Sequence, residues 1–128
     1  MESIISTGIR GEGFETVSHE NTAKRYGSGL VDVYATPAMI ALMETTAMRS
    51  IHPLLPNGMT SVGTEVNVKH LRASAIGELM RCESRVTEVQ GRKVVFEVSV
   101  WDDELLIGHG THTRFIVDEA KFMAQLNA

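Results

Sequence analysis

The chain has 128 residues, of which 43% are hydrophobic and 22% charged, and its formal net charge at pH 7 is −4. This length and composition are typical of one globular domain over residues 1–128. The basic residues are scattered, which argues against nucleic-acid binding, and no apolar run approaches the roughly 20 residues of a membrane span. Without a basic and apolar leader at its start, the chain is expected to be cytoplasmic.

The first part of the chain is expected to form a strand followed by one long helix. A strand-like stretch at residues 9–18 precedes a short polar segment, 19–26, that forms a turn or a short helix. Residues 36–51 have the pattern of one helix, with Thr36 as its N-cap and Pro37 at the first helical position, where the missing N–H costs nothing. The helix should end before the next proline in the sequence.

From Met59 onward the hydrophobic period changes from 3.6 to 2 residues, which indicates strands. Four strands are predicted, at residues 59–72, 78–89, 93–101 and 104–117, with a short helix at 118–126. In the first of these strands, the face that packs on the long helix is expected to carry Val62, Thr64, Val66, Val68 and His70. Because tight turns connect most of the strands, we predict an α+β fold in which one long apolar helix covers an antiparallel sheet.

Glu44 interrupts the apolar face of the long helix. The row at i, i+4, i+7 and i+11 consists of Ile40, Glu44, Ala47 and Ile51. The one basic residue of the helix, Arg49, lies about 140° around the axis from Glu44 and cannot neutralise it locally. A buried carboxylate without a partner is costly and is usually kept for function, whereas a carboxylate at the edge of the apolar stripe reaches water. The helix alone leaves both interpretations open.

Three further residues could take part in chemistry near Glu44. His70 ends the strand face expected to pack on the helix, and a histidine paired with a carboxylate recurs in hydrolytic sites, although alone it is more often structural. Thr36 either caps the helix or, at the positive end of the helix dipole, helps to stabilise an oxyanion. Gly63 marks a bulge or a close approach of the backbone to a ligand.

Other chemistry-bearing residues argue against a metal, a cofactor or a cysteine nucleophile. His109 and His112 are three residues apart on a strand and project to opposite faces, so no metal site is expected. Arg114 shares a face with His112 and could hold a carboxylate or a phosphate. Cys82, the sole cysteine, has no neighbouring histidine. No Gly-x-Ser-x-Gly elbow and no Gly-rich phosphate loop is present, so no cofactor is expected.

Residues 35–44, 60–71 and 110–114 together resemble the hotdog-fold acyl-CoA thioesterases, and in particular the fluoroacetyl-CoA thioesterase-like group. The most specific feature is a spacing of eight residues from Thr36 to Glu44 and twenty-six from Glu44 to His70. The resemblance implies a hotdog fold, with the sheet wrapped around the long helix, and a catalytic set of Thr36, Glu44 and His70. It also implies substrate contacts from Gly63, His70 and Arg114, and a homodimer or a tetramer with active sites at the subunit interface.

We therefore expect hydrolysis of a short-chain acyl-CoA thioester to a free acid and CoA. Glu44 acts either as nucleophile or as general base for water, and His70 carries a proton and stabilises the thiolate. Thr36 positions the substrate or polarises its carbonyl, with the Gly63 amide contributing to the oxyanion site. Residues 27–31 lack the aromatic side chains expected of a lid over a fluorinated acyl group, which favours a general short-chain acyl-CoA.

Two alternatives and one geometric question stay open at this point. The chain could be a hotdog acyl-CoA hydratase or dehydratase, whose acid and histidine usually lie closer in sequence, or a non-catalytic module that binds acyl-CoA or another apolar ligand. Thr36 and Glu44 are about 12 Å apart along a helix, too far to touch one reacting atom. Either Thr36 stands in a loop that folds back, or the site combines residues from two subunits, and we favour the second.

Overall fold

The computed structural model describes residues 4–127. In chain order, its elements are β1 (Arg10–Thr16), η1 (His19–Asn21), α1 (Ala23–Tyr26), α2 (Thr36–Ile51), η2 (His52–Leu54), β2 (Met59–His70), β3 (Leu79–Gln90), β4 (Lys93–Asp102), β5 (Leu105–Asp118) and α3 (Glu119–Leu126). The predicted long helix, the strands and the terminal helix are all present, with small shifts at their ends. None of the helices in the described part of the chain has both the length and the hydropathy needed to span a bilayer.

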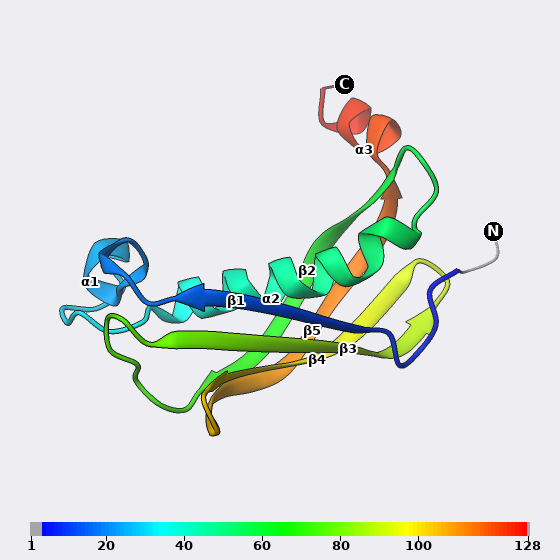
Figure 1. The fold of residues 1–128 in the computed structure, drawn as a ribbon. Helices are drawn as coiled ribbons and strands as arrows, with labels where there is room; N and C mark the ends of the chain where they lie inside the picture. The colour runs from blue at the N-terminus through cyan, green and yellow to red at the C-terminus, as the bar shows by residue number, and fades with distance from the viewer. Residues whose placement is uncertain (1–3, 128) are drawn as a thin grey trace.

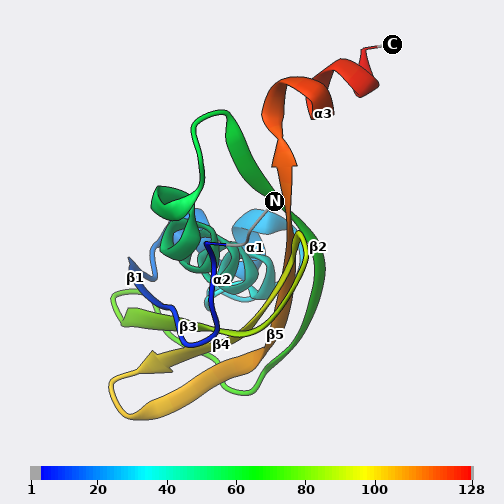
Figure 2. The same ribbon diagram turned by 90° about the vertical axis from the view of Figure 1, so that its right-hand side faces the viewer.

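The five strands form one antiparallel sheet in the order β1-β3-β4-β5-β2. Hairpins join β3 to β4 and β4 to β5, while β2 comes earlier in the chain and pairs with β5 at one edge of the sheet. The sheet curves around α2, and α3 projects from the end of β5 away from the body (Figures 1 and 2). The predicted arrangement of a sheet wrapped around one long helix is therefore present.

The hydrophobic core lies between α2 and the concave face of the sheet. From α2, the core includes Ala38, Met39, Leu42, Met43, Ala47 and Ile51, and from β4 it includes Val94, Phe96, Val98 and Val100. Two glycines of β1 allow the helix to approach that edge of the sheet closely. A Cβ on Gly11 would lie 2.7 Å from the Cβ of Ser50, and one on Gly13 would collide with Oγ1 of Thr46.

The start of α2 differs from the prediction, because Thr36 does not cap the helix. The N-cap is Ala35, whose backbone is extended (φ −75°, ψ 140°), and Thr36 and Pro37 are the first two helical residues. Proline is tolerated at either of these positions because neither N–H has a partner within the helix. The hydroxyl of Thr36 is consequently available to a partner outside α2.

The predicted face of β2 was also wrong at one end, because a bulge reverses the alternation of its side chains. The register with β5 shifts between Gly63 and Glu65, which confirms the bulge predicted at Gly63. Residues that are paired directly across an antiparallel ladder point to the same face. Before the bulge, Ser61 pairs with Ile116, which is buried, so Val62 points outward. The bulge thus directs Ser61 and Gly63, rather than Val62, toward α2.

Candidate active site

The first residue of α2 and the last residue of β2 bring Thr36 and His70 together. Oγ1 of Thr36 lies 2.8 Å from Nδ1 of His70. The ring of His70 meets Tyr34 edge-to-face, with centroids 6.3 Å apart and an interplanar angle of 81°. Tyr34 is itself held by its hydroxyl, which donates to Oε2 of Glu15 at 2.6 Å. Thr36, Tyr34 and His70 line a cleft of about 270 Å³.

The environment of His70 keeps its imidazole neutral. Desolvation lowers the pKa of His70 below its ordinary value of 6.5, an effect that the backbone of Arg72 opposes. Its Nε2 is buried and has no hydrogen-bond partner within residues 4–127. At neutral pH the ring can therefore accept a proton. Either Nδ1–H donates to Thr36, which leaves the hydroxyl proton of Thr36 for another acceptor, or the hydroxyl donates to Nδ1.

Glu44 lies in a second group of residues, near the middle of α2. Its Oε2 is 4.0 Å from Nη1 of Arg114, and its side chain is 40% exposed, against 9% for Arg114. A Cβ on Gly63 would lie 2.8 Å from the same Oε2, so the close approach of β2 to Glu44 requires a glycine. Of the two interpretations left open by the sequence, the edge position is the one observed. Glu44 faces a buried cation on one side and an open hollow of about 260 Å³ on the other.

Arg114 is fixed on β5 by hydrogen bonds to two neighbouring residues. Nε donates to Oγ of Ser61 at 2.8 Å, and Nη2 donates to the backbone carbonyl of Ser61 at 3.0 Å. Nη1 is 3.1 Å from Nε2 of His112. Nδ1 of His112 is in turn 2.8 Å from the carbonyl oxygen of Glu65, and its ring stacks on Phe96 with centroids 6.1 Å apart. Arg114 is therefore a preorganised cation rather than a mobile surface residue.

The predicted site residues thus form two separate groups on one protomer, Thr36 with His70, and Glu44 with Gly63 and Arg114. Glu44 does not line the cleft beside Thr36 and His70, and neither of these residues lines the hollow beside Glu44. The spacing of eight residues from Thr36 to Glu44 corresponds to about 12 Å along α2.

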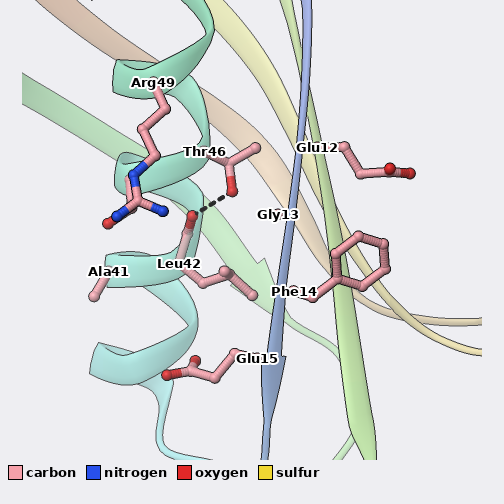
Figure 3. A pocket seen from close by; sticks show the side chains of 9 residues that line it. Glu12, Gly13, Phe14, Glu15, Ala41, Leu42, Thr46 and Arg49 are labelled. Atoms are coloured by element: carbon pink, nitrogen blue, oxygen red, sulfur yellow. Dashed lines mark hydrogen bonds between the residues drawn. The ribbon is translucent and has the colours of Figure 1, made fainter.

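A further groove, of about 240 Å³, lies between β1 and α2 (Figure 3). In this view Glu15 of β1 points toward the helix, Glu12 and Phe14 point away from it, and Arg49 extends along α2. None of the predicted site residues lines the groove. It shares Ala41 and Thr45 with the hollow beside Glu44, so the two lie on opposite sides of one ridge of α2.

Cys82 lies where it cannot act as a nucleophile, and His109 and His112 lie where they cannot bind one metal ion together. Cys82 is buried, and burial raises the pKa of its thiol to about 11, so that no thiolate is present at neutral pH. His109 is exposed and His112 buried, which confirms that the two point to opposite faces of β5. Across residues 4–127, no three His, Cys, Asp or Glu side chains are grouped closely enough to hold a metal ion.

Comparison with known proteins identifies the family. Residues 17–120 match the family model described as fluoroacetyl-CoA-specific thioesterase. The chain belongs to this family. A fluoroacetyl-CoA thioesterase of Streptantibioticus cattleyicolor is 35% identical to it over 95 residues, which cover 74% of this chain and 68% of that protein.

Solved structures agree with this family assignment. The fluoroacetyl-CoA thioesterase FlK superposes with a TM-score of 0.90 at 29% identity, over 98% of this chain and 97% of that chain. A Thermus thermophilus hypothetical protein described as a thioesterase superfamily member superposes with a TM-score of 0.89 at 29% identity. The match covers 99% of this chain and 93% of that chain. A hot-dog-like protein from Thermanaerovibrio acidaminovorans superposes with a TM-score of 0.86 over 94% of this chain and 89% of that chain. At 22% identity, this likeness shows the fold alone. The hotdog fold is confirmed, and this fluoroacetyl-CoA-specific thioesterase family member is an acyl-CoA thioesterase.

Two residues that this thioesterase uses to hold Arg114 were not identified from its sequence. Ser61 was missed because uninterrupted alternation puts it on the outer face of β2, and only the bulge turns it inward. His112 was considered only as a metal ligand and as a residue sharing a face with Arg114. The i, i+2 spacing of a histidine and an arginine on one strand was the available signal, since it places both side chains on the same face.

Proposed function

We propose that the chain hydrolyses short-chain acyl-CoA thioesters as a homodimer of single-domain subunits, without a separate cofactor. Each active site would combine Thr36 and His70 of one subunit with Glu44 of the other. The observation that carries this proposal is the separation, within one protomer, of the 2.8 Å Thr36–His70 contact from the group around Glu44. Catalysis requires groups held within about 3 to 3.5 Å of the reacting atoms, which a spacing of about 12 Å on one helix does not allow.

The free edge of β2 offers a way to join the two groups. β2 has 12 residues and lies at an edge of the sheet, and a long open edge is a template for pairing with another strand. Val66, at its centre, is 36% exposed. If two copies of β2 pair antiparallel about a two-fold axis between Val66 and Asn67, Gly63 lies opposite His70 of the other copy. Glu44, which contacts Gly63, would then approach the Thr36–His70 pair across the interface.

This arrangement supplies each group that thioester hydrolysis requires. Glu44 attacks the carbonyl carbon, either through a water that it deprotonates or directly, forming an anhydride that water then opens. Thr36, accepting Nδ1–H of His70, has its own hydroxyl proton free to donate to the carbonyl oxygen, and the Gly63 amide is a second donor. On the general-base route, the proton that Glu44 takes from water passes to neutral His70, which delivers it to the departing thiolate. On the anhydride route, CoA leaves as a thiolate near His70, and the water that opens the anhydride supplies the proton, which His70 carries to it. The products are a carboxylic acid and CoA.

The modest volume of the cleft and the known relatives support a short acyl group. The cleft beside Thr36 and His70 measures about 270 Å³. One solved FlK variant is in complex with acetyl-CoA, and another is in complex with fluoroacetate and CoA. Leu30 is 93% exposed and Val31 60%, and neither supplies an aromatic cover. We therefore assign this chain short acyl groups in general rather than fluoroacetyl-CoA alone.

Thiol release from a panel of acyl-CoA esters tests the substrate class. We expect kcat/KM to be highest for acetyl- and propionyl-CoA and to decline toward octanoyl-CoA, with fluoroacetyl-CoA within about tenfold of acetyl-CoA. A preference for long chains would contradict the short-chain assignment. Tight binding of every ester without thiol release would contradict hydrolysis itself.

Substitution of Glu44 by glutamine tests the catalytic assignment. The change preserves shape and removes the ionised oxygen, so we expect kcat to fall by about 10²- to 10⁴-fold. The melting temperature should stay near that of the wild type, because the side chain is 40% exposed. Glu104→Gln, at an exposed turn between β4 and β5, is the matched control and should keep full activity. Near-normal turnover in Glu44→Gln would reject the proposed role.

A further inference from the structure

We infer that His112 is a positioning residue of this thioesterase, which as a neutral ring carrying its proton on Nδ1 holds the guanidinium of Arg114 against Glu44 and Gly63. The inference rests on the proposed function in one respect, the catalytic role of Glu44. His112 itself lies behind Arg114 and is 1% exposed, so it acts through the arginine and not on the substrate.

The two hydrogen bonds of His112 leave only one protonation state. A carbonyl oxygen accepts and never donates, so the 2.8 Å contact with the carbonyl of Glu65 requires a proton on Nδ1. A guanidinium donates and never accepts, so the 3.1 Å contact with Nη1 of Arg114 requires a bare Nε2. Both contacts are satisfied only by the neutral Nδ1–H tautomer. A doubly protonated ring would place two donors and two positive charges face to face.

The bonds to Arg114 leave one N–H group free on Nη1, the guanidinium nitrogen recorded near the carboxylate. Ser61 occupies Nε and one proton of Nη2, and His112 occupies one proton of Nη1. A guanidinium has five N–H groups, so one on each terminal nitrogen stays free. Nη1 is the atom 4.0 Å from Oε2 of Glu44. The same nitrogen is therefore bonded to His112 and lies within ion-pair distance of Glu44.

Gly63 shows that this geometry is closely packed. A Cβ at position 63 would lie 2.8 Å from Oε2 of Glu44, 3.2 Å from Cε1 of His112 and 3.3 Å from Nη1 of Arg114. These side chains thus converge on one point of the β2 backbone. His112 has little freedom to turn there, because its ring also stacks on Phe96 at an interplanar angle of 25°. The histidine, the arginine and the carboxylate form one chain of contacts leading to the hollow beside Glu44.

The consequence for catalysis is a defined direction for the Glu44 carboxylate. An arginine free to swing away would leave Glu44 oriented by solvent alone, because its side chain is 40% exposed. The fixed guanidinium attracts the carboxylate electrostatically and holds it near the backbone of Gly63. Loss of His112 is therefore expected to lower kcat more than it changes KM, since the substrate does not touch this residue.

Two substitutions of His112 separate positioning from packing. His112→Phe keeps a ring against Phe96 but removes both nitrogens, and we expect kcat to fall by about ten- to a hundredfold. His112→Gln offers an amide oxygen to Arg114 and should stay within about tenfold of wild type. In an Arg114→Met background, His112→Phe should cause little further loss. Equal activity of His112→Phe, His112→Gln and Arg114→Met would overturn the inference. Fully additive losses in the double variant that combines His112→Phe with Arg114→Met would also overturn it.

Imidazole NMR on the wild-type protein decides the protonation state without reference to activity. Long-range ¹H–¹⁵N correlation of ¹⁵N-histidine-labelled protein at pH 7 should show the ring of His112 protonated on Nδ1 only. Its signal is identified as the one missing in His112→Gln, which separates it from His70, whose ring the proposed function also expects to carry its proton on Nδ1. An Nε2–H tautomer or an imidazolium for His112 would overturn the inference, whether or not His112→Phe folds. Near-normal turnover of Glu44→Gln would instead refute the proposed function and leave the NMR result standing, so the two failures are distinguishable.

Discussion

Thr36 and His70 are 34 residues apart in the sequence, yet Oγ1 of Thr36 lies 2.8 Å from Nδ1 of His70. The contact exists because α2 begins beside the end of β2, and because Ala35, not Thr36, occupies the N-cap. A hydroxyl used for capping would be turned toward the backbone N–H groups of the first helical turn. One residue further along, it is free to bind the imidazole.

The hydroxyl of Thr36 should be essential for turnover, while its methyl group should not. Thr36→Val keeps the shape and removes the donor, so kcat/KM is expected to fall by about 10²-fold, as for loss of one oxyanion donor. Thr36→Ser keeps the hydroxyl and should retain activity within about tenfold. Steady-state thiol release on acetyl-CoA measures both. Equal activity of the valine and serine variants would show that the hydroxyl takes no part.

An alanine at position 63 should damage activity more than stability. Its Cβ would lie 2.8 Å from Oε2 of Glu44 and push the carboxylate away, so we expect kcat to fall about tenfold or more. The melting temperature should fall only moderately. The 40% exposed side chain of Glu44 can move into solvent, while His112 and Arg114, at 3.2 and 3.3 Å from the added Cβ, need to shift by only a few tenths of an ångström. Thr64→Ala, at the adjacent bulge position, is the matched control. A fully active Gly63→Ala variant would show that the position of Glu44 is not critical.

Half-buried His70 and buried His112 should make the fold less stable in mild acid. Desolvation lowers the pKa of both His70 and His112 from 6.5, so just below that pH the unfolded chain binds more protons than the folded chain. The free energy of unfolding is therefore at its full value above pH 6.5 and declines as the pH falls toward the folded pKa values.

Urea unfolding between pH 8 and pH 5 measures this decline. The loss of stability should be smaller in His112→Gln than in wild type, because one of the two groups has been removed. His109→Gln, at an exposed position of β5, is the control and should follow the wild-type curve. A His112→Gln curve parallel to that of the wild type would show that His112 does not contribute.

The elements of this fold could be predicted because their signals are local. The helix 36–51 is marked by apolar spacing and by a proline near each end, and β4 by four alternating apolar residues that are all buried. The order of the strands was not predictable from such patterns. β2 pairs with β5, which begins 35 residues after β2 ends, and no turn between them specifies that contact.

The candidate site shows the same limit at the level of single residues. The spacing of Thr36, Glu44 and His70 suggested one site, but only the docking of α2 on the sheet reveals that Glu44 faces Arg114. The bond from Arg114 to Ser61 spans 53 residues and depends on a bulge that reverses the face of β2. The one extra residue at the bulge of β2 therefore determines which side chains surround the carboxylate of Glu44.

Complementation between two inactive variants tests most directly whether the active site is shared between subunits. Glu44→Gln and His70→Gln are co-expressed with different tags, and the mixed dimer is isolated by two successive affinity steps. In a shared site, one of the two sites of the mixed dimer carries both substitutions and the other carries neither. The mixed dimer should then have about half of the wild-type activity, although each parent homodimer is almost inactive. A mixed dimer as inactive as its parents would contradict the shared site.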